Sequence, residues 1–187
     1  MNRLCPQCKN SLDPSAFDWF GDVCNGCGMS GKHKGMEEFI RESNYIENER
    51  SDRAFEDALQ AYKWFIKKDD FNFADILEVH KILMARLNLR IAGCSRRVPV
   101  RVGNRICPKP DLIGKLMVLW LSKHRRAKTW DNIKEAHIVF EQIHPFEDGN
   151  GRVGRIILNW QRVKVGMPIL VIKESEKNEY YKWFDEK

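Results

Sequence analysis

The sequence has no long apolar run, and this excludes several classes of protein. Its apolar stretches are far shorter than the roughly 18 residues of a membrane-spanning helix. The N-terminus, Met-Asn-Arg-Leu-Cys-Pro, lacks the apolar centre of a signal peptide. Internal repeats and low-complexity tracts are also missing, so we expect neither a repeat architecture nor a long disordered segment. We therefore expect a cytoplasmic protein that makes no membrane contact.

A strong excess of one charge is missing too. The 187 residues include 32 Lys and Arg against 26 Asp and Glu, a formal net charge of +6. An excess of this size fits a polyphosphate ligand as well as nucleic acid, so charge alone does not decide between them. The basic run from Lys123 to Arg126 could touch nucleic acid, but its pattern favours a solvated helix end. With 43% hydrophobic residues, the chain can bury one sizeable core plus a small appendage.

Cysteines are few, but four of the six are regularly spaced. Cys5 and Cys8 form one C-x-x-C pair, and Cys24 and Cys27 form a second. This separation is typical of a structural zinc site with four thiolate ligands, which leaves no open position for chemistry. Disulfides are the alternative, but a reducing compartment disfavours them. We predict that residues 1–35 form a small zinc ribbon and a linker.

The rest of the chain, residues 36–187, has helical periodicity almost throughout. Apolar residues recur at helical spacing in 52–68, 73–87, 112–120, 133–143 and 153–163. The exception is 96–106, where Val98, Val100 and Val102 alternate before Gly103-Asn104, a pattern typical of a β-hairpin. The sequence therefore predicts an all-α bundle with one hairpin. His80 and His137 fall on apolar faces, and we expect both to be core histidines with satisfied hydrogen bonds.

The most informative segment is 144–155, His-Pro-Phe-Glu-Asp-Gly-Asn-Gly-Arg-Val-Gly-Arg. His144 can accept a hydroxyl proton, and Asp148 can hold Mg²⁺. The glycines let backbone N–H groups approach phosphate oxygens, and Arg152 and Arg155 can neutralise negative charge. The segment joins two predicted helices, so the positive end of the second helix faces a bound anion. Together these features predict a phosphate-transfer site.

Residues 144–155 match the signature His-Pro-Phe-x-[Asp/Glu]-Gly-Asn-Gly-Arg-x-x-Arg at every position, and the chain resembles the Fic (Fic/Doc) family over nearly all of 36–187. This resemblance implies transfer of AMP from ATP to a Tyr, Ser or Thr hydroxyl of a target protein. His144 would be the general base and Asp148 the Mg²⁺ ligand. The implied nucleotide-binding residues are Gly149, Asn150, Gly151, Arg152, Arg155, Tyr180 and Tyr181, the two tyrosines at the adenine. The Doc branch, which transfers a terminal phosphate, has Lys where this chain has Gly151, so the glycine favours AMP transfer.

The resemblance also implies a docking element for the target. The segment 93–110 resembles the flap of the family, in which an edge strand carrying Val98, Val100 and Val102 would pair with the backbone of the target. An ordinary surface hairpin is the alternative. Arginines at 96, 97, 101 and 105 suggest an acidic target.

A second motif lies about a hundred residues upstream. Ser43 to Asn48 fits the inhibitory pattern [Ser/Thr]-x-x-x-Glu-[Gly/Asn], within a helix expected over 36–50. The resemblance implies that Glu47 pairs with Arg155 in competition with the γ-phosphate of ATP, while Ser43 shares its helix face.

Two other functions remain open: removal of AMP or transfer of another nucleotide by the same site, and non-enzymatic binding of protein or nucleic acid through the zinc ribbon. A homo-oligomer is also left open.

Overall fold

A computed structural model describes residues 3–4, 11–12 and 35–184 of the chain. The predicted ligands Cys5, Cys8, Cys24 and Cys27 lie outside these residues, so the zinc ribbon stays a prediction. The first two strands, β1 (Arg3–Leu4) and β2 (Ser11–Leu12), pair antiparallel with Arg3 opposite Leu12. Within the described part of the chain, no helix is long and apolar enough to span a bilayer.

The predicted all-α bundle is confirmed, and its helices begin where the sequence supplies capping groups. The helices before the hairpin are α2 (Met36–Ile46), α3 (Asp52–Ile66) and α4 (Phe73–Met84). Ser51 caps α3 by accepting from the Ala54 amide, and Asn72 caps α4 in a reciprocal capping box with Asp75. The helices after the hairpin are α5 (Ile113–His124), α6 (Trp130–Ile143), α7 (Asn150–Lys164) and the short α8 (Lys177–Tyr181). Short 3-10 turns, η2 (Pro110–Leu112), η3 (Glu174–Glu176) and η4 (Lys182–Phe184), join or extend these elements.

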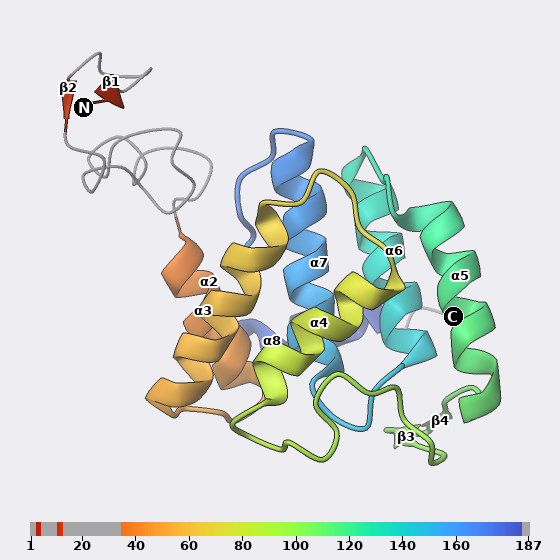
Figure 1. Ribbon diagram of the computed structural model, residues 1–187. Helices are drawn as coiled ribbons and strands as arrows, with labels where there is room; N and C mark the ends of the chain where they lie inside the picture. Colours follow the sequence, from red (N-terminus) through yellow and green to blue (C-terminus); the bar gives the residue numbers. More distant parts are fainter. Residues whose placement is uncertain (1–2, 5–10, 13–34, 185–187) are drawn as a thin grey trace.

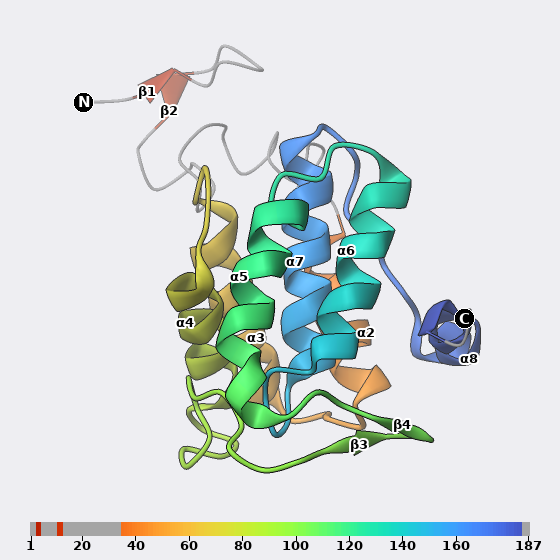
Figure 2. The ribbon, with the colours of Figure 1, turned by 90° about the vertical axis from the view of Figure 1, so that its right-hand side faces the viewer.

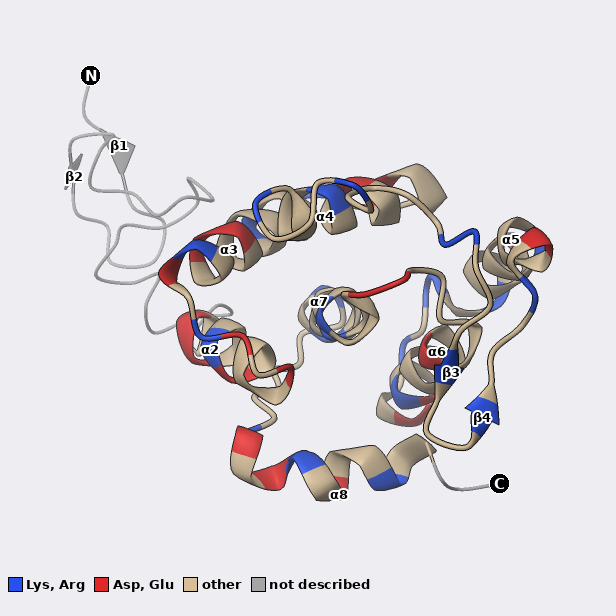
Figure 3. Cartoon of the chain, turned by 90° about the horizontal axis from the view of Figure 1, so that it is seen from below, with Lys and Arg blue, Asp and Glu red and all other residues tan. Residues whose placement is uncertain are grey.

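Helix α7 is the centre of the bundle. Seen from below, it stands end-on in the middle, with the other helices around it (Figure 3). Its apolar residues Val153, Ile156 and Ile157 are buried in the main core, to which α2 through α6 also contribute. Its polar residues are buried as well, among them Arg152 and Arg155. A helix enclosed on all sides must find partners for such groups inside the protein, and these partners define the site described below.

The predicted hairpin is present but shorter than expected. Strand β3 (Arg101–Val102) pairs with β4 (Arg105–Ile106) around Gly103, whose φ is 56°. It lies at the same end of the bundle as the loop that leads into α7 (Figures 1 and 2). Val98 and Val100 precede the strand, because Pro99 has no N–H to donate to a ladder.

Helix α2 also ends earlier than the predicted 36–50. Ile46 is its last residue, Glu47 is its C-cap, and Asn48 follows with a φ of 59°. Asparagine tolerates this left-handed conformation better than most residues and is therefore a common helix terminator. The predicted inhibitory motif consequently straddles the end of a helix, with Ser43 inside it and Glu47 at its cap.

Candidate active site

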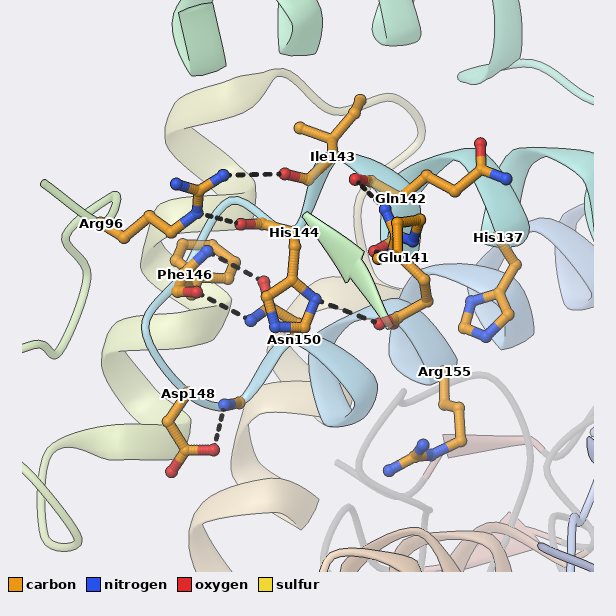
Figure 4. Close-up of polar contacts among 12 residues, drawn as sticks. Arg96, His137, Glu141, Gln142, Ile143, His144, Phe146, Asp148, Asn150 and Arg155 are labelled. Carbon is orange, nitrogen blue, oxygen red and sulfur yellow. Dashed lines mark hydrogen bonds and ion pairs between the residues drawn. The ribbon is translucent and has the colours of Figure 1, made fainter. Parts of the chain in front are cut away.

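The signature segment reverses the chain between α6 and α7. The amide of His144 still donates to the Phe140 carbonyl at 3.0 Å, but its own φ is 52°, so α6 stops there. Gly149, with a φ of 80°, is the N-cap of α7. Residues 144–149 thus form a tight connection whose last residue opens a long buried helix (Figure 4).

Hydrogen bonds within this loop and a ring contact with α4 hold it in place. The Asn150 side chain accepts from the Phe146 amide and donates to the Phe146 carbonyl, both at 2.9 Å. The Phe146 ring is fully buried and lies flat on His80 of α4, with centroids 3.8 Å apart and planes 3° from parallel. Asn150 therefore orients the loop, with both polar atoms of its amide engaged.

His80 ties the loop to α4 and to the start of the flap. The Gly93 amide donates to its Nδ1 at 3.0 Å, so Nδ1 is unprotonated and Nε2–H donates to the Asp148 carbonyl, also at 3.0 Å. Burial lowers the pKa of His80 to about 4, which keeps the ring neutral in this role. The prediction of a satisfied core histidine is confirmed at this position.

Two arginines of the flap bind the end of α6, contrary to the expectation of four outward-facing charges. Arg96 is 2% exposed, and its guanidinium donates to the His144 carbonyl at 2.7 Å (Figure 4). It also donates to the carbonyls of Pro108 at 2.6 Å and Val98 at 3.1 Å. The guanidinium of Arg105 donates to two more carbonyls of the last turn of α6. A helix C-terminus has unpaired carbonyls and partial negative charge, which explains why it attracts them. Of the four flap arginines, Arg97 and Arg101 are left exposed.

The basic run at the end of α5 is likewise engaged within the chain. Arg125 and Arg126 both pair with Asp70, at 3.2 and 2.6 Å, and Lys123 pairs with Glu135 at 2.9 Å. This agrees with the interpretation of the run as a helix end.

His144 presents one ring nitrogen inward. Its Nδ1 is buried without a hydrogen-bond partner, 3.9 Å from Oε2 of Glu141 one turn earlier on α6. Burial lowers the pKa of His144 to about 4 and raises the pKa of Glu141 to about 8. The imidazole is therefore neutral at physiological pH, as a general base must be.

Arg152 is a buried cation with incomplete pairing. It is 4% exposed, its Nε has no partner, and its Nη2 lies 3.4 Å from the Met84 sulfur and 3.5 Å from Oδ2 of Asp148. A buried guanidinium normally has all its donors satisfied, because desolvating an unpaired charge is costly. An anion at the N-terminus of α7 would supply the missing acceptors.

Arg155, one turn further along α7, is fully paired, and its main partners come from α2. Its guanidinium donates to Ser43 Oγ and to the Ser43 carbonyl, both at 2.9 Å, and to Glu47 Oε1 at 2.7 Å. Burial alone would raise the pKa of Glu47, but the attraction of Arg155 and Arg152 outweighs it and the pKa is lowered. Glu47 is therefore an ionised partner of a buried arginine.

Gly151 gives this contact room. A Cβ built there would overlap Oε1 of Glu47 and lie 2.9 Å from Nη1 of Arg155. Any side chain at this position would displace the carboxylate, which gives the glycine a steric role besides its backbone freedom.

The two tyrosines predicted at the adenine lie near Arg155 but differ in exposure. Tyr180 is 3% exposed, and its hydroxyl lies 2.7 Å from Nε2 of His137 and 3.4 Å from Nη1 of Arg155. Tyr181 is 42% exposed, so its ring is the one that a base could reach. The role of both at the nucleotide stays a prediction. The Nδ1 of His137 has no partner, so this core histidine is only half satisfied.

Asp148 is the carboxylate that could hold a metal here. Its Oδ1 accepts from the Gly149 amide at 2.6 Å, and its side chain is 65% exposed. Among the residues that the structure describes, no cluster of three or more His, Cys, Asp or Glu side chains could hold a metal ion. One carboxylate suits Mg²⁺ when the phosphates of a substrate provide further ligands.

Sequence reasoning missed Arg96, Arg105 and Glu141 as parts of the site. Only Glu141 left a recognisable signal: with His137 and His144 it occupies the positions i, i+4 and i+7, so three polar residues share one face of α6.

Comparison with known proteins agrees with this geometry. The Fic/DOC family model matches residues 70–161. The protein adenylyltransferase Fic of Drosophila yakuba is 34% identical over 121 residues, and that of Aedes aegypti 32% over 123 residues. Each alignment covers 62% of this chain but only 24% of the relative, so the chain spans about a quarter of their length. A Fic-domain-containing signalling protein from Bacteroides thetaiotaomicron has the same fold, with a TM-score of 0.73 at 17% identity, covering 90% of this chain and 78% of the other. For Fic-1 of C. elegans the TM-score is 0.70 at 19% identity, with coverage of 90% and 60%.

Proposed function

We propose that this chain, which carries a Fic/DOC family domain, transfers AMP from ATP to a hydroxyl group of a target protein. The observation that carries the proposal is the arrangement at the N-terminus of α7. A neutral His144, the N–H groups of the first helical turn and the incompletely paired Arg152 lie around one rigid loop. A polyphosphate would satisfy the arginine and the helix N-terminus together.

In the proposed reaction, His144 accepts the proton of the target hydroxyl. The hydroxyl oxygen then forms a bond to the α-phosphorus, the bond between that phosphorus and the bridging oxygen breaks, and pyrophosphate leaves with its electron pair. Gly149, Asn150 and Gly151 provide the backbone of the anion site, and Arg152 and Arg155 bind the β- and γ-phosphates. The rigid loop keeps the base and the phosphate site in a fixed relation, which is where most of the catalytic advantage would arise.

Mg²⁺ would be held by Asp148 together with the phosphates. Its chemical contribution when bound is to neutralise charge on the phosphate oxygens. The exposed carboxylate, fixed by the Gly149 amide, fits this use.

We further propose that Glu47 keeps the enzyme inactive. Its carboxylate occupies one of the donors of Arg155 that a γ-phosphate would need, while Ser43 occupies two more. ATP can therefore bind productively only when the end of α2 moves away.

The exposed flap supports a docking role. Val98 and Val102 are 48% and 41% exposed, and a short edge strand beside the His144 loop could pair with an extended segment of the target. With Arg96 and Arg105 turned inward, the electrostatic argument for an acidic target rests on Arg97 and Arg101 alone.

Other parts of the proposal concern the whole protein. Residues 1–35 would form a structural zinc ribbon, and thiolate ligands of this kind suit the reducing cytosol. The site around His144 could instead remove AMP from a modified target, in which case Glu47 would take part in that reverse reaction.

The test uses ATP labelled at the α-phosphate. A Glu47→Gly variant of the full chain should label itself or a lysate protein, and a Glu47→Gly, His144→Ala double variant should not. ATP labelled at the γ-phosphate is the control for phosphate transfer and should give no label. Binding of ATP without any α-label would contradict AMP transfer, and release of AMP from a pre-labelled target by the wild-type chain would favour removal.

A further inference from the structure

Glu141 lies next to the candidate base, on the side facing away from the loop residues that follow it. It is on α6, its side chain is 13% exposed, and Oε2 points at Nδ1 of His144 over 3.9 Å (Figure 4). Its Oε1 is buried without a partner beside Gly154 of α7, where an added Cβ would overlap it. A buried carboxyl oxygen without a partner lowers the stability of the fold, because burial removes its hydration. A buried polar group of this kind calls for an explanation such as a functional role.

The His144 nitrogen that faces Glu141 also lacks a hydrogen-bond partner. Nδ1 is buried and unpartnered, so Nε2 is the nitrogen that a substrate hydroxyl can reach. A neutral imidazole carries one proton, and it can act as a base at Nε2 only when that proton is on Nδ1. A group that accepts a hydrogen bond from Nδ1–H selects this tautomer.

The other polar groups nearby have partners of their own. Arg96 and Arg105 bind backbone carbonyls at the end of α6. The backbone carbonyl of Glu141 also faces the His144 ring, but it already accepts from Arg105 at 2.9 Å. Among the described residues, Glu141 is the one carboxylate within ion-pair distance of the His144 ring. A separation of 3.9 Å is too long for a hydrogen bond, but such contacts often tighten once substrate is bound.

We propose that Glu141 is a positioning residue for His144: its carboxylate accepts the hydrogen bond from Nδ1–H, fixes the tautomer with Nε2 free, and stabilises the imidazolium that forms when His144 takes the hydroxyl proton. The proposal rests on the proposed function, because it assumes that His144 is the base. The same division of labour is known from the carboxylate of serine protease triads.

The charges around Glu141 predict how the rate of AMP transfer should depend on pH if Glu141 positions His144. Burial raises the pKa of its carboxyl to about 8, Arg155 on α7 and Arg105 on β4 oppose this increase, and Glu47 at the end of α2 adds to it. His137 on α6 and His144 at its C-cap are neutral because burial lowers their pKa values. Tyr180 and Tyr181 on α8 also face Glu141, and burial raises their pKa values, so both stay neutral. Ionised Glu141 is the stronger acceptor for Nδ1–H, and its negative charge stabilises the imidazolium, so the transfer rate should rise with pH as this carboxyl loses its proton.

The first experiment does not depend on activity. Nitrogen-15 spectra of the ligand-free full-length Glu47→Gly protein, with His144→Ala for assignment, report which ring nitrogen of His144 carries the proton. At a pH above the pKa of Glu141, we expect the Nδ1–H tautomer, its loss in Glu141→Leu, and its retention in the control Glu135→Gln, which changes a carboxylate elsewhere on α6. An unchanged tautomer in a folded Glu141→Leu variant overturns the proposal.

The second experiment measures AMP transfer in the same proteins. Glu141→Leu should lower kcat by roughly 10- to 100-fold, the range found for groups that orient metal-bound histidines, with KM for ATP unchanged. Glu141→Gln, which should fold because it needs no ionised group, should lose the rise of rate with pH. A change in KM alone, or an unaltered pH profile in Glu141→Gln, overturns the proposal. A Glu141-dependent tautomer in a protein that transfers no AMP would support the positioning role and reject the proposed function.

Discussion

Replacing Arg96 with methionine tests how the flap and the site loop are held together. Methionine keeps an apolar stem of similar length but removes all the donors of the guanidinium. The carbonyls of His144, Pro108 and Val98 then lose a charged partner at 2.7, 2.6 and 3.1 Å. Bonds to a charged donor contribute about 1.5–3 kcal/mol each, which gives a gross loss of roughly 5–9 kcal/mol. The variant also avoids the cost of burying a charged group, which offsets several kcal/mol of this loss.

We therefore expect Arg96→Met to lower the free energy of unfolding by roughly 2–4 kcal/mol. The measurement is urea denaturation, with limited proteolysis of residues 96–108 as a local probe. Arg97→Met is the matched control, because Arg97 is the exposed neighbour, and it should change stability by no more than about 0.5 kcal/mol. If the two variants unfold at the same urea concentration, the guanidinium does not stabilise this end of the bundle, and the explanation given for its burial is wrong.

Four further predictions follow from the same contacts. Glu47→Gln should raise kcat/KM for AMP transfer about 10-fold, since a charged hydrogen bond of about 1.5 kcal/mol no longer competes with ATP; initial rates with α-labelled ATP measure this, and no increase would contradict inhibition by Glu47. Asp148→Asn should raise the Mg²⁺ concentration needed for half-maximal rate at least about 10-fold with little change in melting temperature, because the side chain is exposed; an unchanged Mg²⁺ requirement would exclude Asp148 as the ligand. Gly154→Ala should cost about 1–3 kcal/mol in urea denaturation, because the new methyl group would overlap Glu141 and lie 2.9 Å from Cε1 of His137; a fully stable variant would mean that α6 and α7 are not packed this closely. Elemental analysis of the purified protein should find one zinc per chain, lost in Cys24→Ser, and a metal-free wild type would reject the ribbon.

The parts of the molecule that the sequence predicted well are those encoded locally. Helix periodicity and capping residues depend on neighbours in the chain, and so do the glycines on either side of a turn, which is why α3, α4, α6 and α7 were placed almost correctly. The position of His144 at the end of one helix and of Asn150 at the start of the next follows from the same local signals.

Partners that are distant in the sequence could not be predicted in this way. Arg96 and Arg105 were interpreted as surface charges because arginine side chains are usually exposed. Nothing nearby in the sequence indicates that they bind carbonyls at the end of α6, about forty residues later. The end of α2 is a different case, because Asn48 is a local signal that competes with helical periodicity and terminates the helix.

If Glu47 inhibits the enzyme as proposed, the N-terminus of α7 explains why Glu47 and the nucleotide would exclude one another. Because α7 is enclosed, its N-terminal turn can be approached only where the neighbouring side chains leave space, and the space beside Gly151 is the one that Glu47 enters. A larger residue there would close that approach to the carboxylate and crowd the guanidinium of Arg155 as well. The glycine that would let phosphate oxygens approach the backbone therefore also leaves room for the Glu47 carboxylate, the proposed competitor. The proposed inhibition is a direct competition, because Glu47 and the γ-phosphate would need the same arginine and the same gap.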